Sequence, residues 1–215
     1  MTIVWRFLVS FLIGSIPFAK IAMLGTGIDI TKVGSKNPGY LNVSRVASRW
    51  RAALTLLGDL FKGYVALLLL GGGDFAPVWL WVIGIGAVMG HCWSPFLGFN
   101  GGKGVATTFG VLLKLEPRIT LVSLPLYPFL RFVGSKAGWS QRGAIASLST
   151  AFAIMVAVTV LRGLQPGFFA AIMLAIVVVR HASNIREIIA PGPAGSSAES
   201  KSQRVDVRPA HRQSR

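Results

Sequence analysis

Long apolar runs alternate with short polar connections along most of the chain. A helix that crosses a bilayer needs about 20 predominantly apolar residues, and most of these runs approach that length. Seven runs occur, over residues 3–24, 52–70, 77–92, 105–115, 119–132, 144–161 and 167–179. The pattern predicts an all-α, polytopic integral membrane protein with about seven transmembrane helices.

Two of the seven runs are not simple spans. The run 105–115 is short for a full crossing, and the run 119–132 contains Pro125 and Pro128, which should bend it. A re-entrant pair here would lower the number of crossings by two. Pro17 lies inside the first run, where neighbouring membrane helices can satisfy the freed carbonyl.

Composition supports the membrane assignment. Hydrophobic residues make up 53% of the 215 residues and charged residues 13%, and the mean hydropathy is +0.61, which excludes a water-soluble domain of average composition. The first run lacks a clear signal-peptide cleavage site. A single cysteine, Cys92, excludes an internal disulfide and a four-cysteine metal site.

The net charge of +15 is better explained by membrane orientation than by nucleic-acid binding, because the basic residues lie between apolar runs. With the N-terminus outside, the inner loops and the C-terminal end hold sixteen basic residues and the outer turns hold three. The positive-inside rule therefore predicts an outer N-terminus and a cytoplasmic C-terminus. Residues 1–190 form the membrane domain, and residues 191–215, rich in Gly, Pro, Ser and charges, are predicted to be a disordered basic tail.

A glycine-rich stretch around one lysine, GHCWSPFLGFNGGKGVAT over residues 90–107, interrupts the apolar pattern. Glycines let backbone N–H groups approach a ligand closely, and the helix predicted from Val105 adds the positive end of its dipole. The stretch suits an anion, although a plain turn between membrane helices is the alternative. It is not a P-loop, which would need glycine at Leu97 and a hydroxyl at Gly104.

Polar residues elsewhere allow both structural and functional interpretations. The loop 25–51, with a turn at 34–39 and a short helix predicted over 43–51, either binds a ligand or only sets topology. Asp59 and Lys62 either pair within the bundle or contribute charge to a site. His91 is either a packing and loop-anchoring residue or catalytic. His181 is either a helix cap or a site residue that shares a helical face with Asn184.

Several blocks together resemble one family, the PlsY-type acyl-phosphate:glycerol-3-phosphate acyltransferases. The blocks occur in the expected order over about residues 11–190. They are Gly14-Ser15-Ile16-Pro17-Phe18; Gly34-Ser35-Lys36-Asn37-Pro38-Gly39 with Asn42-Val43 and Arg45; Asp59 with Lys62-Gly63; Gly90-His91, Pro95-Phe96-Leu97-Gly98-Phe99 and Gly101-Gly102-Lys103-Gly104-Val105-Ala106-Thr107; and Arg180-His181 with Asn184-Ile185.

The resemblance implies a multi-pass enzyme of the bacterial inner membrane with its site on the cytoplasmic face. It would transfer an acyl chain from acyl phosphate to the 1-hydroxyl of glycerol 3-phosphate, giving lysophosphatidic acid and phosphate in phospholipid biosynthesis. Cationic donors suit two phosphate-bearing substrates, and an acyl phosphate is already activated, so no cofactor or metal is expected. A substrate phosphate is thought to help take the hydroxyl proton in the family. No nucleic-acid partner is expected, and the sequence does not determine the oligomeric state.

The resemblance also assigns roles to individual residues. Ser35 and the loop through Arg45 would bind acyl phosphate, while Arg45, Lys103, His181 and Asn184 would hold glycerol 3-phosphate. The expected catalytic residues are therefore Ser35, Arg45, Lys103, His181 and Asn184. Further substrate-binding residues are expected at Gly34, Lys36, Asn37, Gly39, Asn42, Lys62, His91, Gly101, Gly102, Gly104 and Thr107.

Several positions depart from the family pattern. Lys36 stands where glycine is usual and Glu187 where a basic residue is usual, while Ala144 removes an expected hydroxyl. The remaining departures are Tyr40, Leu41, Asn100, Pro191 and Pro193. They are compatible with altered substrate preference or with a weakly active family member.

Two other classes of protein fit these residues less well than this family. An acyltransferase of the His-x4-Asp type is disfavoured, because Phe96 and Arg186 stand five residues after His91 and His181. A transporter of organic anions would also use broken helices and buried cations, but its two halves would be related, and no internal repeat is visible.

Overall fold

Helices are the only regular elements in the residues that the structure, a computed structural model, describes: 2–73 and 76–190. The helices are α1 (Ile3–Ser15), α2 (Phe18–Ala22), α3 (Tyr40–Val46), α4 (Arg49–Leu70), α5 (Val78–Cys92), the 3-10 helix η1 (Pro95–Leu97), α6 (Val105–Leu115), α7 (Pro117–Ser123), α8 (Leu126–Lys136), α9 (Arg142–Arg162), α10 (Leu164–Arg180) and α11 (Ala182–Ile189). The predicted tail, residues 191–215, with Pro191 and Pro193, lies outside the described residues.

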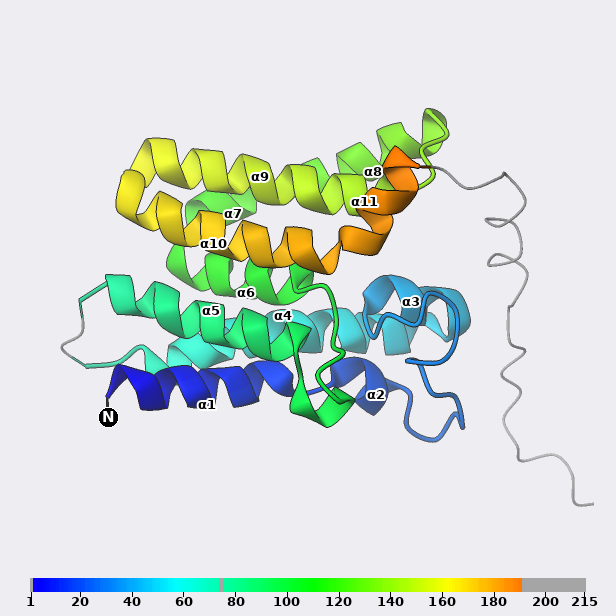
Figure 1. Cartoon of the computed structure of the whole chain (residues 1–215), viewed down its shortest axis with the longest axis horizontal. Helices are drawn as coiled ribbons and strands as arrows, with labels where there is room; N and C mark the ends of the chain where they lie inside the picture. Colours follow the sequence, from blue (N-terminus) through cyan, green and yellow to red (C-terminus); the bar gives the residue numbers. More distant parts are fainter. Residues whose placement is uncertain (1, 74–75, 191–215) are drawn as a thin grey trace, which may run out of the picture.

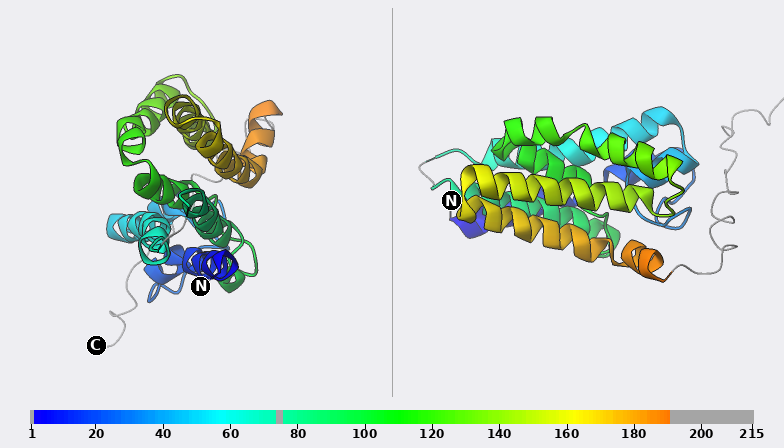
Figure 2. Two further views of the ribbon diagram at one scale, coloured as in Figure 1. Left: turned by 90° about the vertical axis from the view of Figure 1, so that its left-hand side faces the viewer. Right: turned by 90° about the horizontal axis from the view of Figure 1, so that it is seen from above.

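The long helices run side by side along one axis (Figures 1 and 2). α5 is the central helix, because it packs against α1, α4, α6 and α10. Its buried face meets the buried faces of α4, α6, α9 and α10 in one apolar core. Close approach of α1 and α5 requires glycine, since a Cβ at Gly14 or Gly90 would overlap the main chain of the other helix.

Helix length identifies four candidate membrane spans in the described part of the chain: Ile3–Ala22, Arg49–Leu70, Val78–Leu97 and Arg142–Arg162. α10 and α11 are bent by 66° relative to each other, and they form a fifth candidate span if this bent pair counts as one span. α6 is a shorter apolar helix, as its sequence run predicted. The all-α membrane class is thus confirmed, while the count of seven crossings stays a prediction.

Three predicted boundaries are wrong. The first run is broken at Ile16–Pro17 into α1 and α2, because proline there lacks the N–H that a continuous helix needs. The helix predicted over 43–51 is instead α3, which ends at Val46, followed by an extended Ala47 and the start of α4 at Arg49. The run predicted to end at residue 132 continues as a helix through Lys136, the last residue of α8.

The run 119–132 is not one bent helix but two helices, α7 and α8, with a break at Leu124–Pro125. Pro128 lies in the first turn of α8, where its missing N–H has no intrahelical partner to lose. Pro117 begins α7 in the same way. Pro125 and Pro128 are close in sequence but differ in effect, and of these two only Pro125 coincides with the break between α7 and α8.

The polar connections gather at one end of the helix array (Figure 1). The segment that leads from α2 to α3, the loop before α6, the turn between α8 and α9, and α11 all lie there, at the end opposite the N-terminus. This arrangement brings the loop 25–51, the glycine loop before α6 and the start of α11 to a single end of the molecule.

Candidate active site

A cavity of about 2960 Å³ opens among these connections. Its lining comes from α3, α4, α6, α8, α9, α10 and α11, from the end of α5, and from the loops before α3, α6 and α9. It includes most of the predicted site residues: Gly34, Ser35, Lys36, Asn37, Gly39, Arg45, His91, Gly101, Lys103, Gly104, His181 and Asn184. Asn42, Lys62, Gly102 and Thr107 do not line it.

A chain of hydrogen bonds that begins at Lys103 runs through four residues of the cavity lining. The Lys103 ammonium donates to Asn184 Oδ1, and Asn184 Nδ2 donates to Gln141 Oε1 at 2.6 Å. Gln141 Nε2 in turn donates to the Glu187 carboxylate. The loop before α6, the N-terminus of α9 and α11 are therefore joined by polar side chains.

The glycine loop, residues 98–104, is held by hydrogen bonds to the end of α5 and by one arginine. Gly101 N–H donates to Cys92 O and Gly102 N–H donates to His91 O, each at 3.1 Å. Arg180 binds the carbonyl oxygens of the same two glycines, at 2.7 Å from Nη2 to Gly101 O and 3.1 Å from Nε to Gly102 O. The prediction that these amides face a ligand is wrong for Gly101 and Gly102, because both N–H groups are already used.

The loop before α3 is shaped by Asn42, which is 1% exposed. Its Oδ1 accepts from Ser35 N–H at 2.9 Å, and its Nδ2 donates to Ile30 O and Val33 O at 3.1 and 3.0 Å. Gly34 adopts a φ of 56°, and a Cβ there would overlap the Asn42 amide. Asn42 thus positions Ser35 without lining the cavity.

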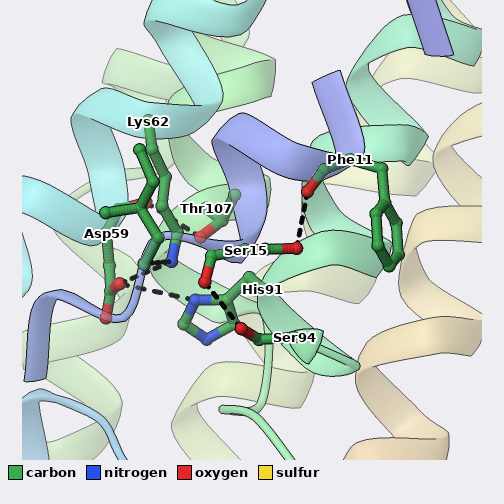
Figure 3. A network of polar contacts seen from close by, with 8 residues as sticks. Phe11, Ser15, Asp59, Lys62, His91, Ser94 and Thr107 are labelled. Atoms are coloured by element: carbon green, nitrogen blue, oxygen red, sulfur yellow. Dashed lines mark hydrogen bonds and ion pairs between the residues drawn. The ribbon is translucent and has the colours of Figure 1, made fainter. Parts of the chain in front are cut away.

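Lys62, His91 and Thr107 belong to a buried polar cluster (Figure 3). Lys62 Nζ lies 2.8 Å from Asp59 Oδ1 and donates to Ile16 O at 3.0 Å. His91 Nδ1 lies 3.4 Å from the same carboxylate oxygen, and Thr107 Oγ1 donates to Asp59 O at 2.8 Å. Lys62 and Asp59 therefore pair within the bundle, and the cluster joins α1, α4, α5 and α6.

His181 is 3% exposed and follows the last residue of α10. Its Nδ1 lies 2.8 Å from Val177 O, and since a carbonyl oxygen only accepts, Nδ1 carries the proton. In the neutral ring Nε2 is then an acceptor. The bond both caps the helix end and sets the tautomer, so the two interpretations of His181 are compatible.

Cations dominate the lining. They are Lys36, Arg45, Arg49, Arg51, Lys103, Arg131, Arg142 and Arg180, while Asp59 and Glu187 are the acidic lining residues in the described part of the chain. Burial lowers the pKa of the Lys103 ammonium, as do Arg45 and Arg180, whereas Glu187 opposes the shift. A phosphate placed beside Lys103 would favour its charged form.

The lining also has an apolar part, to which α4, α6 and α9 contribute. It includes Leu56, Leu60, Phe109, Leu112 and Ile154. Leu112 is near the C-terminal end of α6 and Ile154 is in the middle of α9. The cavity lining therefore combines cationic and apolar side chains, as an amphiphilic ligand combines a charged head with an apolar chain.

Comparison with known proteins identifies the family. A family model described as glycerol-3-phosphate acyltransferase matches residues 4–191. The chain belongs to the glycerol-3-phosphate acyltransferase family. Relatives with that name include one from Geobacter sulfurreducens, 38% identical over 180 residues that cover 84% of this chain and 90% of the relative. One from Neisseria meningitidis is 40% identical over 190 residues, with the same two coverages.

Solved structures agree with this family in fold. A crystal structure of PlsY (YgiH), an integral membrane glycerol 3-phosphate acyltransferase, in its glycerol 3-phosphate form has a TM-score of 0.76 at 27% identity and covers 87% of this chain and 92% of its own. The lysophosphatidic acid form has a TM-score of 0.74 at 26% identity, covering 87% and 91%. This family member is thus an integral membrane protein of the PlsY type.

The structure also places the departures from the family pattern. Lys36, at a position where glycine is usual, has a φ of 57°, and Ala144, where a hydroxyl is usual, lines the cavity. Asn100 Oδ1 is 3.5 Å from Arg180 Nη2. Tyr40 and Leu41 line the cavity as well.

Sequence reasoning missed two residues of the site. Arg180 appeared only as part of a motif, although a cation at the end of an apolar run next to His181 was a usable signal. Gln141 belongs to no motif and lies in an irregular turn, so its contact with Asn184, 43 residues away, had no signal in the local sequence.

Proposed function

We propose that this protein transfers an acyl chain from acyl phosphate to the 1-hydroxyl of glycerol 3-phosphate in phospholipid biosynthesis. The products are 1-acyl-glycerol 3-phosphate, which is lysophosphatidic acid, and inorganic phosphate. The observation that supports this best is the cavity, because the same space is lined by Arg45 and Lys103 and by Phe109, Leu112 and Ile154. A phosphate head joined to an acyl chain matches both parts of that lining.

The reaction needs alignment and charge stabilisation more than a strong protein base. The 1-hydroxyl oxygen attacks the acyl carbonyl carbon, the new ester bond forms, the bond from that carbon to the phosphate oxygen breaks, and the hydroxyl proton passes to a phosphate oxygen. Phosphate is a good leaving group, and cationic donors stabilise the negative charge on the oxyanion and the phosphates.

Individual roles follow the resemblance to the family, and the position of these donors around one cavity supports them. Ser35, held by Asn42, and the loop through Arg45 bind acyl phosphate. Arg45, Lys103, His181 and Asn184 hold glycerol 3-phosphate, where Nε2 of neutral His181 accepts a hydrogen bond from a glycerol hydroxyl. The Lys103 ammonium, donor only, binds the phosphate.

The membrane orientation is part of the proposal. Loops rich in Lys and Arg gather at the cavity end, and such loops stay on the cytoplasmic side of a bacterial inner membrane. The cavity would therefore open to the cytoplasm. Water-soluble glycerol 3-phosphate would enter from that side, while the acyl donor would enter from the bilayer. The N-terminus would lie outside.

Phosphate release by the purified protein tests the reaction. In detergent, with acyl phosphate and glycerol 3-phosphate, we expect release of free phosphate and formation of lysophosphatidic acid. Lys103→Ala and Arg45→Ala should each lower the rate by about 100-fold or more, because each removes a charged donor to a phosphate. Controls are Lys20→Ala and Arg118→Ala, two exposed cations outside the cavity lining.

Turnover that depends on glycerol 3-phosphate, with both products in equal amounts, would support the proposal. Unchanged rates in Lys103→Ala and Arg45→Ala would refute the assigned roles. No product from an intact, folded preparation with acyl phosphate would refute the donor.

A further inference from the structure

Gln141 stands in the middle of the hydrogen-bond chain in the cavity lining. It is the residue before α9, and its amide bonds two residues of α11, Asn184 and Glu187. Both ends of the amide are therefore used, its oxygen by Asn184 and its nitrogen by Glu187.

The chain has only one consistent direction. An ammonium donates and never accepts, so Lys103 selects the oxygen of the Asn184 amide. The Asn184 nitrogen must then donate to the Gln141 oxygen, and the Gln141 nitrogen to the Glu187 carboxylate, which only accepts when ionised. Gln141 thus fixes which end of the Asn184 amide faces Lys103.

Packing does little to hold Asn184 in place. α11 contains no buried residue and leaves α10 at a bend of 66°. A short exposed helix of this kind is free to move unless side chains tie it to a neighbour. Lys103 supplies one such tie through Asn184. Gln141 supplies the other, because it connects Asn184 and Glu187 of α11 to the residue that precedes α9.

We propose that Gln141 is a positioning residue for glycerol 3-phosphate, with Glu187 as its anchor. This inference rests on the proposed function and adds to it a determinant of substrate affinity that lies on α9. Gln141 acts through Asn184 and Lys103, while Glu187 holds the Gln141 amide in the orientation that Asn184 needs.

Substitutions at Gln141 and at Glu187 remove different hydrogen bonds, so their effects can be told apart. Gln141→Leu keeps the approximate size of the side chain but loses both hydrogen bonds, so Asn184 keeps only its bond with Lys103 and α11 loses its link to Gln141. Glu187→Leu frees the Gln141 nitrogen only. Glu187→Gln keeps an acceptor oxygen for Gln141 and removes the negative charge, which separates hydrogen bonding from electrostatics.

The experiment measures kcat and the KM of each substrate for these variants. We expect Gln141→Leu to raise the KM for glycerol 3-phosphate about tenfold, the effect of losing roughly one hydrogen bond to a positioned group. The KM for acyl phosphate should change less than about twofold by the same reasoning. Glu187→Leu should raise the KM for glycerol 3-phosphate several-fold. Glu187→Gln should leave that KM close to the wild-type value.

Gln165→Leu is the matched control, because it is the same change at an exposed position in the first turn of α10, at the end of that helix away from His181. A glycerol 3-phosphate KM in Gln141→Leu no higher than in Gln165→Leu would overturn the inference. So would equal losses for both substrates, which indicate general damage, or a Glu187→Gln variant as impaired as Glu187→Leu, which indicates charge alone.

A second readout separates this inference from the proposed reaction. Glycerol 3-phosphate alone, without acyl phosphate, should raise the thermal unfolding midpoint of the wild-type protein, since a ligand that binds the folded state stabilises it. Gln141→Leu should need about ten times more ligand for the same shift. If turnover fails but this difference is found, the acyl donor is wrong and the role of Gln141 stands; equal ligand requirements refute the role of Gln141.

Discussion

Lys36 is one of two non-glycine residues at positive φ in the part of the chain that the structure describes, with φ 57°. A side chain in this conformation costs about 1–2 kcal/mol, which glycine avoids. After the greater freedom of glycine in the unfolded chain is subtracted, we expect Lys36→Gly to raise the free energy of unfolding by about 0.5–1 kcal/mol. Thermal unfolding in detergent measures it. Lys32→Gly, at a residue without positive φ, is the control and should lower the midpoint; a lower midpoint in both variants would contradict the strain.

At the scale of elements, α4 carries a buried ion pair into the helix array. Side chains of Asp59 and Lys62 are 5% and 3% exposed, so removing one partner leaves an uncompensated buried charge. We expect Lys62→Met to lower the free energy of unfolding by about 3 kcal/mol, and Asp59→Asn added to it to recover most of that loss. Thermal unfolding of both proteins provides the comparison. If the double variant is no more stable than the single one, pairing is not the stabilising role of Lys62.

For the whole molecule, the two ends of α10 test the orientation. Leu164 is 82% exposed at one end, and Ser183 is exposed just beyond the other. The excess of basic residues at the cavity end predicts that it faces the cytoplasm. A membrane-impermeant thiol reagent on intact cells should therefore label Leu164→Cys but not Ser183→Cys, and both after permeabilisation. The native Cys92 is buried, which keeps the background low; labelling of Ser183→Cys in intact cells would reverse the topology.

Much of the fold was predictable because hydrophobic periodicity is local. The runs that became α4, α5, α6, α9 and α10 were located to within a few residues. The effect of each proline was harder to predict, since Pro17 and Pro125 coincide with helix breaks whereas Pro117 and Pro128 lie in the first turns of helices. The outcome depends on where the helix starts, and that start depends on neighbouring elements.

For the candidate site, the sequence predicted the side chains better than the main-chain groups. Ser35, Arg45, Lys103, His181 and Asn184 were named from motifs and line one cavity, although their roles in the reaction stay predictions. The glycine amides were misjudged, because the glycines predicted a close approach of main chain but not which partner would approach. In the structure that partner is the end of α5.

The amino-acid sequence by itself determined the membrane class, the approximate helix positions and the cationic character of one end, because each depends on residue type and local spacing. Only the tertiary structure decided which polar groups meet. Gln141 with Asn184, Arg180 with the glycine loop, and Thr107 with the main chain of Asp59 are contacts over 43 to 79 residues. Such pairs arise from how the helices pack, and no local pattern records them.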